Sequence, residues 1–366
     1  MCVRESARDA PPARRAAPLF RIAIPFLLTT LSVGGPARSA CADAPGKPVD
    51  KAACVPITRY GARSDGTDAT RAIQRAIEVA KSLDARCVYI PAGKYNASQI
   101  TVDGGVKMIG GGDESVLYAP DPANRQVKLT GAGAGLYSLK IYTVGKKRTN
   151  DDEGVWIEED ATNFVIDDVT IDGGNGPGII TYGGSWGRIT NNRVYNTRSD
   201  SIHMSGGAHH VYIAGNKVRN SGDDMIAVVT YAYHPVNTYE ILIENNDVAD
   251  QPWGRGLSVV GGENITIRDN RISRSSDAGI YIAAESSWAT RGVNNVVVLD
   301  GNAVGDTPTE AIRVEPRHTS NIACRGNTED GEVIAPSECG GDAAIITGSS
   351  VTGALLGGDT VPLPAK

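Results

Sequence analysis

Two short landmarks recur along the chain in step with each other, and this repetition restricts the fold more than any other feature. Asparagines that follow a short apolar stretch recur at intervals of 24, 30, 24, 32 and 25 residues, at Asn192, Asn216, Asn246, Asn270, Asn302 and Asn327. A second landmark, a residue directly before Val, Ile or Leu, recurs at intervals of 24, 23, 24, 31, 23 and 32 residues, at Gly154, Gly178, Ser201, Met225, Gly256, Gly279 and Ala311. Periods of this length indicate a solenoid of stacked repeats.

The segments between the turns predict strands that are too short to form a sheet alone. Antiparallel hairpins would not keep one registered landmark through seven repeats, whereas parallel coils keep it naturally. Each coil then pairs with the next and buries its Ile, Val and Leu side chains inside. We therefore predict an all-β fold, a single-stranded right-handed parallel β-helix, in which the asparagines form an inward ladder of amides with a structural role.

One helix is predicted, over residues 68–82, before the repeats begin. Its apolar residues recur at helical spacing, and Thr67 or Asp68 can cap its first turn. Short strands are expected on either side of it, at 55–60 and 87–90. We interpret the helix as a cap that covers the open N-terminal end of the β-helix.

The N-terminal 42 residues are typical of an export signal. Arginines precede an apolar run at 22–31, and Ala40-Cys41-Ala42 fits a small-x-small cleavage pattern. We therefore divide the chain into a signal peptide (1–42), a linker (43–54), the β-helix domain (55–340) and a C-terminal tail (341–366), and expect a secreted or periplasmic protein with no membrane association after cleavage.

Charge and cysteine content limit the partners. Residues 1–42 carry six arginines against Glu5 and Asp9, so without them the formal charge falls from −6 to about −10. Such a surface does not favour nucleic acid. The remaining cysteines, which allow three pairings, predict disulfides in an exported protein: Cys54, Cys87, Cys324 and Cys339. No spacing resembles a zinc site, and we expect neither a metal nor another cofactor, and a monomer.

Acidic and basic residues gather where the repeats predict stacked positions. The residue before the second landmark is Asp200, then Asp224, then Arg255 in three successive coils, with Asp223 beside Asp224. Registered positions in a parallel stack lie about 4.8 Å apart per coil. When carboxylates lie this close together, the pKa of at least one of them rises. The result is a proton donor beside an ionised acid, which is the pair that glycoside hydrolysis requires.

The longer repeats predict loops along this column. The extra residues fall at 143–153, 231–239, 286–292 and 305–309 and would form the walls of a groove. Aromatic side chains that could face sugar rings, or pack, lie in or near these loops: Tyr231, Tyr233, His234, Trp253 and Trp288.

Four stretches together resemble the motif series of polygalacturonase-type glycoside hydrolases (family 28). They are Ser199-Asp200-Ser201-Ile202-His203, Gly222-Asp223-Asp224, Gly254-Arg255-Gly256 and Ala311-Ile312-Arg313-Val314. The segments 63–74 and 88–93 are similar to the N-terminal cap of the wider pectate-lyase-like superfamily, and that wider resemblance covers roughly residues 55–340.

The resemblance implies an inverting hydrolase that acts on a polysaccharide. Asp223 would be the general acid, and Asp200 and Asp224 would hold and deprotonate the attacking water. Arg313 would bind substrate, and the predicted column adds His203, Arg255 and Tyr281 as further candidates for substrate binding. The chain departs from the family pattern twice, with Arg255 in place of a histidine and Glu315 in place of a lysine.

Two other functions stay open from the residues themselves. A polysaccharide lyase or uronate epimerase would need a base such as Tyr281 or His203 and a cation such as Arg255. A non-catalytic glycan-binding β-helix is also possible, because a fold alone does not determine a function. Such a protein would keep its function without the three aspartates.

Overall fold

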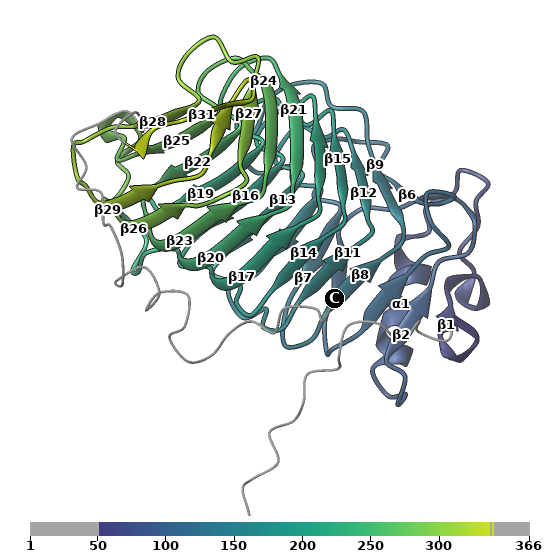
Figure 1. Cartoon of the computed structure of the whole chain (residues 1–366). Helices are drawn as coiled ribbons and strands as arrows, with labels where there is room; N and C mark the ends of the chain where they lie inside the picture. Colours follow the sequence, from purple (N-terminus) through teal and green to yellow (C-terminus); the bar gives the residue numbers. More distant parts are fainter. Residues whose placement is uncertain (1–50, 337–338, 340–366) are drawn as a thin grey trace, which may run out of the picture. The chain divides into compact units, whose positions relative to one another are not determined.

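The chain folds into a solenoid of parallel β-strands. The computed structural model describes residues 51–336 and 339; the predicted signal peptide, most of the linker and the tail lie outside these residues. Three sheets run along the solenoid, and successive coils contribute neighbouring strands to each (Figure 1). Every strand-to-strand pairing in the described part is parallel except that between β30 and β31 at the C-terminal end.

Two of the sheets have eleven strands each and one has nine. Sheet A contains β1 (Val55–Pro56), β2 (Cys87–Tyr89), β5 (Lys107–Ile109), β8 (Gly135–Tyr137), β11 (Val165–Asp167), β14 (Arg188–Thr190), β17 (His209–Ala214), β20 (Tyr239–Glu244), β23 (Gly262–Arg268), β26 (Val293–Val298) and β29 (Thr319–Cys324). Sheet B contains β3 (Gly93–Asn96), β6 (Ser115–Tyr118), β9 (Lys140–Tyr142), β12 (Thr170–Asp172), β15 (Arg193–Tyr195), β18 (Lys217–Arg219), β21 (Asp247–Gln251), β24 (Arg271–Ser275), β27 (Ala303–Gly305), β30 (Thr328–Glu329) and β31 (Glu332–Val333). Sheet C contains β4 (Ile100–Val102), β7 (Val127–Leu129), β10 (Val155–Ile157), β13 (Ile179–Tyr182), β16 (Ile202–Ser205), β19 (Ile226–Val229), β22 (Leu257–Val260), β25 (Ile280–Ala283) and β28 (Ile312–Val314).

The asparagine column forms a continuous amide ladder inside the solenoid, as predicted. The Asn192 amide donates to Asn216 Oδ1 at 2.9 Å, and the Asn216 amide donates to Asn246 Oδ1 at 2.9 Å. The same bond continues through Asn270 and Asn302 to Asn327. All six side chains are buried, so each amide satisfies polar groups that the turns would otherwise leave unpaired.

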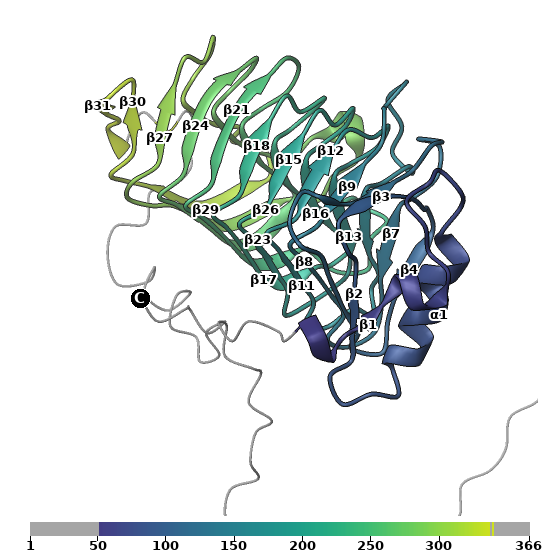
Figure 2. The same cartoon turned by 90° about the vertical axis from the view of Figure 1, so that its right-hand side faces the viewer.

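The predicted helix is present as α1 (Thr70–Ala80), shorter at both ends than the sequence indicates. The Asp68 carboxylate accepts a hydrogen bond from the Thr70 N–H at 2.9 Å. The buried face of α1 packs against β1, β2 and β4 and joins the main core, so the helix covers the N-terminal coil (Figure 2). None of the helices in this part of the chain has the length and apolar character needed to cross a lipid bilayer.

The first predicted strand is only partly correct. Residues 55 and 56 pair with β2, but the chain then turns into the 3-10 helix η2 (Ile57–Tyr60), which ends at Gly61 with φ of 94°. Two further 3-10 turns are η1 (Lys51–Ala53) and η3 (Ser286–Trp288). The backbone leaves the sheet here because the chain must reach α1, which lies across the end of the coil rather than beside it.

The two cysteine pairs differ. Cys54 and Cys87 form a disulfide that ties the start of the domain to β2. Cys324, at the end of β29, is buried as a thiol, and its hydrogen bond with Cys339, together with burial, raises its pKa. The structure therefore contains one of the two disulfides that the sequence suggests, and brings the other two sulfur atoms into contact.

Candidate active site

The polar column lies where the chain enters sheet C. The strand register pairs Ile202 with Ile226 and Ile226 with Leu257, so the residues two positions earlier, Asp200, Asp224 and Arg255, stack on successive coils. Backbone bonds extend the ladder into the turns. The Ser201 N–H donates to the Asp224 carbonyl at 3.1 Å, and the Met225 N–H donates to the Arg255 carbonyl at 3.1 Å. The predicted stacking is therefore present, and the ladder holds these positions in place.

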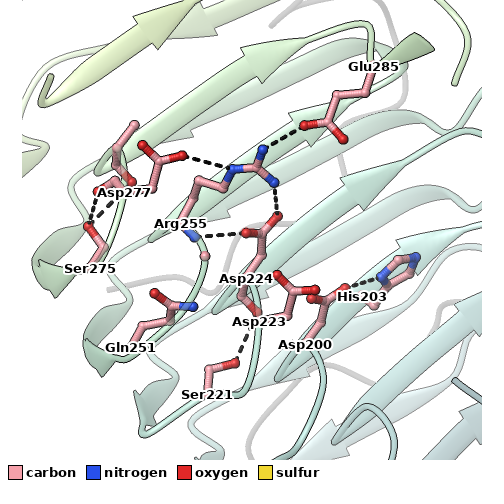
Figure 3. A network of polar contacts seen from close by, with 12 residues as sticks. Asp200, His203, Ser221, Asp223, Asp224, Gln251, Arg255, Ser275, Asp277 and Glu285 are labelled. Carbon is pink, nitrogen blue, oxygen red and sulfur yellow. Dashed lines mark hydrogen bonds and ion pairs between the residues drawn. The ribbon is translucent and has the colours of Figure 1, made fainter. Parts of the chain in front are cut away.

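The three aspartates meet at one point (Figure 3). One carboxylate oxygen from each of Asp200, Asp223 and Asp224 lies within 4.8 Å of the other two. Asp200 and Asp224 are buried, whereas the Asp223 side chain is 24% exposed. Asp223 is thus the member of the trio that solvent or a ligand reaches most easily.

Asp200 and Asp224 each have a fixed partner. His203 on β16 makes a bond from Nδ1 to Asp200 Oδ2 at 2.5 Å. The Arg255 backbone N–H donates to Asp224 Oδ1 at 2.8 Å, and its guanidinium lies 3.7 Å from the other oxygen. These bonds fix the orientation of both carboxylates.

Tyr281 and Arg313 lie in the predicted column but belong to a separate cluster. The strand register aligns Ser258, Tyr281 and Arg313. The Tyr281 ring is 6% exposed and lies between the guanidinium groups of Arg255 and Arg313, 4.3 and 4.6 Å from its centroid. Arg313 makes two bonds to Asp277, at 2.8 and 2.7 Å. Both side chains are occupied by protein partners beside the trio.

Arg255 is similarly occupied. Besides Asp224 it binds Glu285 at 2.6 Å and lies 3.5 Å from Asp277 (Figure 3). Sequence reasoning missed both of these acids. The repeat pattern could have identified Asp277. It comes directly before Ala278, which is a position of the predicted column, just as Asp223 comes directly before Asp224. Glu285 follows the end of strand β25, where the strand register no longer predicts the position of a side chain.

Arg148 is the other residue that sequence reasoning missed. It comes from the loop 143–153, forms an ion pair with Asp223, and its guanidinium lies 5.3 Å from the centre of the Trp253 ring. This loop precedes β10 and so stands at the edge where chains enter sheet C. At the opposite edge, the loops after β19 and β25 join through the Ala232 N–H, which donates to the Ala289 carbonyl at 2.7 Å. The loops therefore lie at both edges of sheet C, and the loop 143–153 lies at the edge where the trio is found.

Buried hydroxyl groups hold the turns that carry the aspartates. Ser201 Oγ donates to Ser221 Oγ at 3.1 Å, and Ser221 Oγ donates to the Asp224 carbonyl at 3.1 Å. Thr197 extends this network towards the turn before Asp200, at 3.1 Å from Ser201 Oγ. A satisfied buried network of this kind limits the movement of the groups attached to it.

The close packing of three acids changes their protonation. Burial and the neighbouring Asp200 charge raise the pKa of Asp223 to about 6, against the opposing effect of Arg148. The same two causes raise the pKa of Asp224 to about 7, against the opposing effect of Arg255. The trio therefore retains a proton near pH 6 that Asp223 and Asp224 share, and Asp223 is the more exposed of the two and so the one that a ligand reaches.

This proton predicts a pH-dependent stability. The folded protein binds it more tightly than the unfolded chain, in which the aspartate pKa is 3.8, so stability is lost as the pH rises from about 4 to about 6. We expect Asp223→Asn to raise Tm by about 2–4 °C at pH 8, and the gain to fall to about half at pH 5, in calorimetric scans of both proteins. An equal difference at the two pH values would contradict the raised pKa.

The trio is also a set of oxygen donors. Among the described residues, Asp200, Asp223 and Asp224 are close enough together to share one cation. The Arg148 and Arg255 guanidinium groups pair with Asp223 and Asp224 and balance part of the negative charge of the trio.

Comparison with known proteins agrees with the fold. Residues 153–328 match the family model described as "Right handed beta helix region". The comparison with curated proteins gives no match.

Solved structures of similar fold include several that act on polysaccharides. The catalytic unit of a GH87 α-1,3-glucanase from Streptomyces thermodiastaticus strain HF3-3 superposes with a TM-score of 0.59 at 19% identity, over 80% of this chain and 66% of that chain. The A-module of the mannuronan C-5 epimerase AlgE6 from Azotobacter vinelandii gives 0.57 at 20% identity, over 75% of this chain and 86% of that one. A hyperthermoactive exopolygalacturonase from Thermotoga maritima gives 0.57 at 13% identity, over 75% and 81%.

At these identities the likeness concerns the fold. The family match, the three parallel sheets and the superpositions together show that the chain has a right-handed parallel β-helix fold.

Proposed function

We propose that this protein is a polysaccharide-degrading glycoside hydrolase whose catalytic groups are Asp200, Asp223 and Asp224. The observation that carries the proposal is the meeting of three carboxylates from adjacent coils, with oxygens within 4.8 Å of one another and two pKa values raised. Glycoside hydrolysis needs a protonated acid beside an ionised one, and this cluster supplies both near pH 6.

The roles follow from what each carboxylate contacts. Asp223 is the most exposed of the three and donates its proton to the leaving glycosidic oxygen. Asp200, held by His203, and Asp224, held by Arg255, lie side by side and together bind and deprotonate the attacking water. Activity should fall as the pH rises above about 6 to 7, where the proton shared by Asp223 and Asp224 is lost.

Arg148 must move when the substrate binds. Its guanidinium pairs with a carboxylate oxygen of Asp223, the residue that donates the proton in this mechanism. Withdrawal of this loop arginine removes the positive charge that stabilises the carboxylate, and so favours the protonated form of Asp223 in the complex.

The expected stereochemistry is inversion. One water held by Asp200 and Asp224 attacks the anomeric carbon while Asp223 protonates the leaving group. The anomeric carbon therefore undergoes a single displacement, which inverts its configuration. The nearest oxygens of the trio, within 4.8 Å, are closer than the roughly 6.5–9.5 Å usual for an inverting acid and base, and near the roughly 5–5.5 Å usual for retaining pairs. Proton NMR of the first sugar anomer released therefore tests the water-bridging role directly. Retention of the anomeric configuration would show instead that one aspartate attacks the sugar as a nucleophile.

Hydrolysis is supported better than elimination or epimerisation. Those reactions need a base that reaches the substrate, and Tyr281 is buried between two guanidinium groups. Burial, followed by the charge of Glu285, raises its pKa. His203 Nδ1 is already bonded to Asp200.

We also propose that the protein acts outside the cytoplasm, in the periplasm or medium. The Cys54–Cys87 disulfide supports this location, because such bonds persist in oxidising compartments.

The test is to incubate the purified mature protein with acidic and neutral polysaccharides and to follow reducing ends and ultraviolet absorbance together. Hydrolysis predicts new reducing ends without absorbance, and equal rates with and without a chelator. Absorbance from an unsaturated uronate would establish a lyase instead. If both signals are absent and binding is retained, proton NMR of the recovered polymer separates an epimerase, which changes the uronate composition, from a glycan-binding protein, which does not.

A further inference from the structure

A cavity of about 830 Å³ adjoins the trio on the side of sheet B. Its walls come from the turns between sheets B and C in the same coils that carry the polar column. Thr197 and Arg198 precede Asp200, Ser221 and Gly222 precede Asp223, and Pro252 and Trp253 precede Arg255. The coil register that aligns the trio therefore also aligns this cavity beside it. Its volume lies within the range of roughly 300–1,000 Å³ that is usual for ligand sites.

Arg148 connects the cavity with the trio. Its side chain lines the cavity and also pairs with Asp223. A glycan whose leaving oxygen lies at Asp223 would therefore continue, past Arg148, into the cavity. The aspartates themselves do not line it, so its occupant is a neighbouring sugar and not the reacting bond.

The lining suits a sugar ring. Asn220 donates to Asn196 Oδ1 at 2.7 Å, and Asn196 donates to Asp172 Oδ1 at 2.8 Å, which forms a row of planar polar groups along one wall. Trp253, which is 67% exposed, presents an aromatic ring at the same cavity. Amide rows and one exposed aromatic face are the combination by which ring hydroxyls and an apolar ring face are bound.

Arg198 gives the cavity its charge preference. In the part of the chain that the structure describes, its guanidinium donates to the Gly145 carbonyl at 3.2 Å and forms no ion pair. The other arginines near the trio, Arg148, Arg255 and Arg313, are each paired with an acid. Asp172, the acid of this cavity, is paired with Lys140 at 2.8 Å.

We propose that this cavity is a subsite for an anionic sugar residue adjacent to the cleaved bond, with Arg198 binding its carboxylate and Trp253 contacting its ring. The proposal rests on the proposed glycan substrate but not on the chemistry at the trio. It places carboxylate recognition at Arg198, and not at Arg255 or Arg313, where the resemblance to known enzymes would place it.

Binding is measured by calorimetry in an Asp200→Asn background, which prevents turnover and leaves the Arg148–Asp223 pair intact. The probes are trigalacturonate and trimannuronate, each beside its carboxyl-reduced trisaccharide. We expect an acidic trimer to bind at least about tenfold more tightly than its reduced form. Arg198→Gln should remove this preference, and Trp253→Ala should weaken both forms by about fivefold.

Two matched controls separate local contact from general effects. Arg325→Gln removes an exposed arginine elsewhere on the solenoid, and Trp288→Ala removes a tryptophan that is 61% exposed but does not line the cavity. Both should leave affinity within about twofold.

Equal affinity for acidic and reduced trimers, no binding of either, or equal loss in the control variants would overturn the subsite. Hydrolysis by the wild-type protein in any of those cases would leave the proposed function standing. Selective binding through Arg198 without hydrolysis of any polymer would support the subsite and contradict the proposed function.

Discussion

Replacing Asp223 with Asn is expected to lower kcat for polysaccharide hydrolysis by about 10²–10⁴-fold, because an amide cannot protonate the leaving oxygen. The expected loss is in kcat rather than KM, since the proton is transferred only in the transition state. Reducing-end assays over a range of substrate concentrations measure both. The variant should keep its fold, because Asp223 is the most exposed of the trio and its neighbours hold the backbone through Ser221 and the coil ladder.

The matched control is Asp247→Asn. Asp247 is also an aspartate in an ion pair with an arginine, Arg219 at 2.6 Å, but it lies on β21 of sheet B. The Asp247→Asn variant should retain the kcat of the wild-type protein. Equal activity of the two variants, with unchanged circular dichroism, would remove Asp223 from the mechanism and favour the glycan-binding alternative. Asp200→Asn and Asp224→Asn should lose activity to a similar degree, because both hold the water.

Replacing Asn246 with Ala is expected to destabilise the fold by roughly 3–5 kcal/mol. Its amide donates to Ile213, Glu244 and Asn270, and its Oδ1 accepts from both the backbone and the side chain of Asn216. Alanine leaves buried donors and acceptors on three coils without partners. Urea unfolding followed by circular dichroism measures the loss as a lower midpoint.

Asn294→Ala is the comparison. Asn294 is partly exposed and accepts hydrogen bonds from Ser320 at 3.0 Å and Asn321 at 2.8 Å, both of which can bond to water instead. Its loss should cost less than about 1 kcal/mol. If both variants unfold at the same urea concentration, the interior ladder has no special contribution to stability.

The coil repeat made most of the fold predictable. Two landmarks in step indicated parallel coils, and a parallel ladder places the same position of each coil one above the next. This is why the spacing of the landmarks was enough to predict the stacking of Asp200, Asp224 and Arg255, and the asparagine ladder from Asn192 onwards. The end of the helix and the bend at Ile57 were less predictable, because they depend on how α1 packs over the first coil.

The partners of the polar column could not be derived in this way. Arg148 reaches Asp223 from a loop 75 residues earlier in the chain, outside any ladder. Tyr281 and Arg313 are in the predicted register, but spacing does not specify that Arg313 turns towards Asp277 and stacks on the Tyr281 ring. Likewise, four cysteines allowed three pairings, and the fold brought Cys54 and Cys87 to a Cα separation of 4.8 Å.

The amino-acid sequence by itself therefore determined the coil, its register and the meeting of the three aspartates, since hydrogen bonds between parallel strands repeat with the chain. Only the tertiary structure decided which side chains neutralise those acids, which arginine is left without an acidic partner, and where the adjoining cavity lies. These features depend on loops and on side-chain directions, and no periodic ladder constrains either.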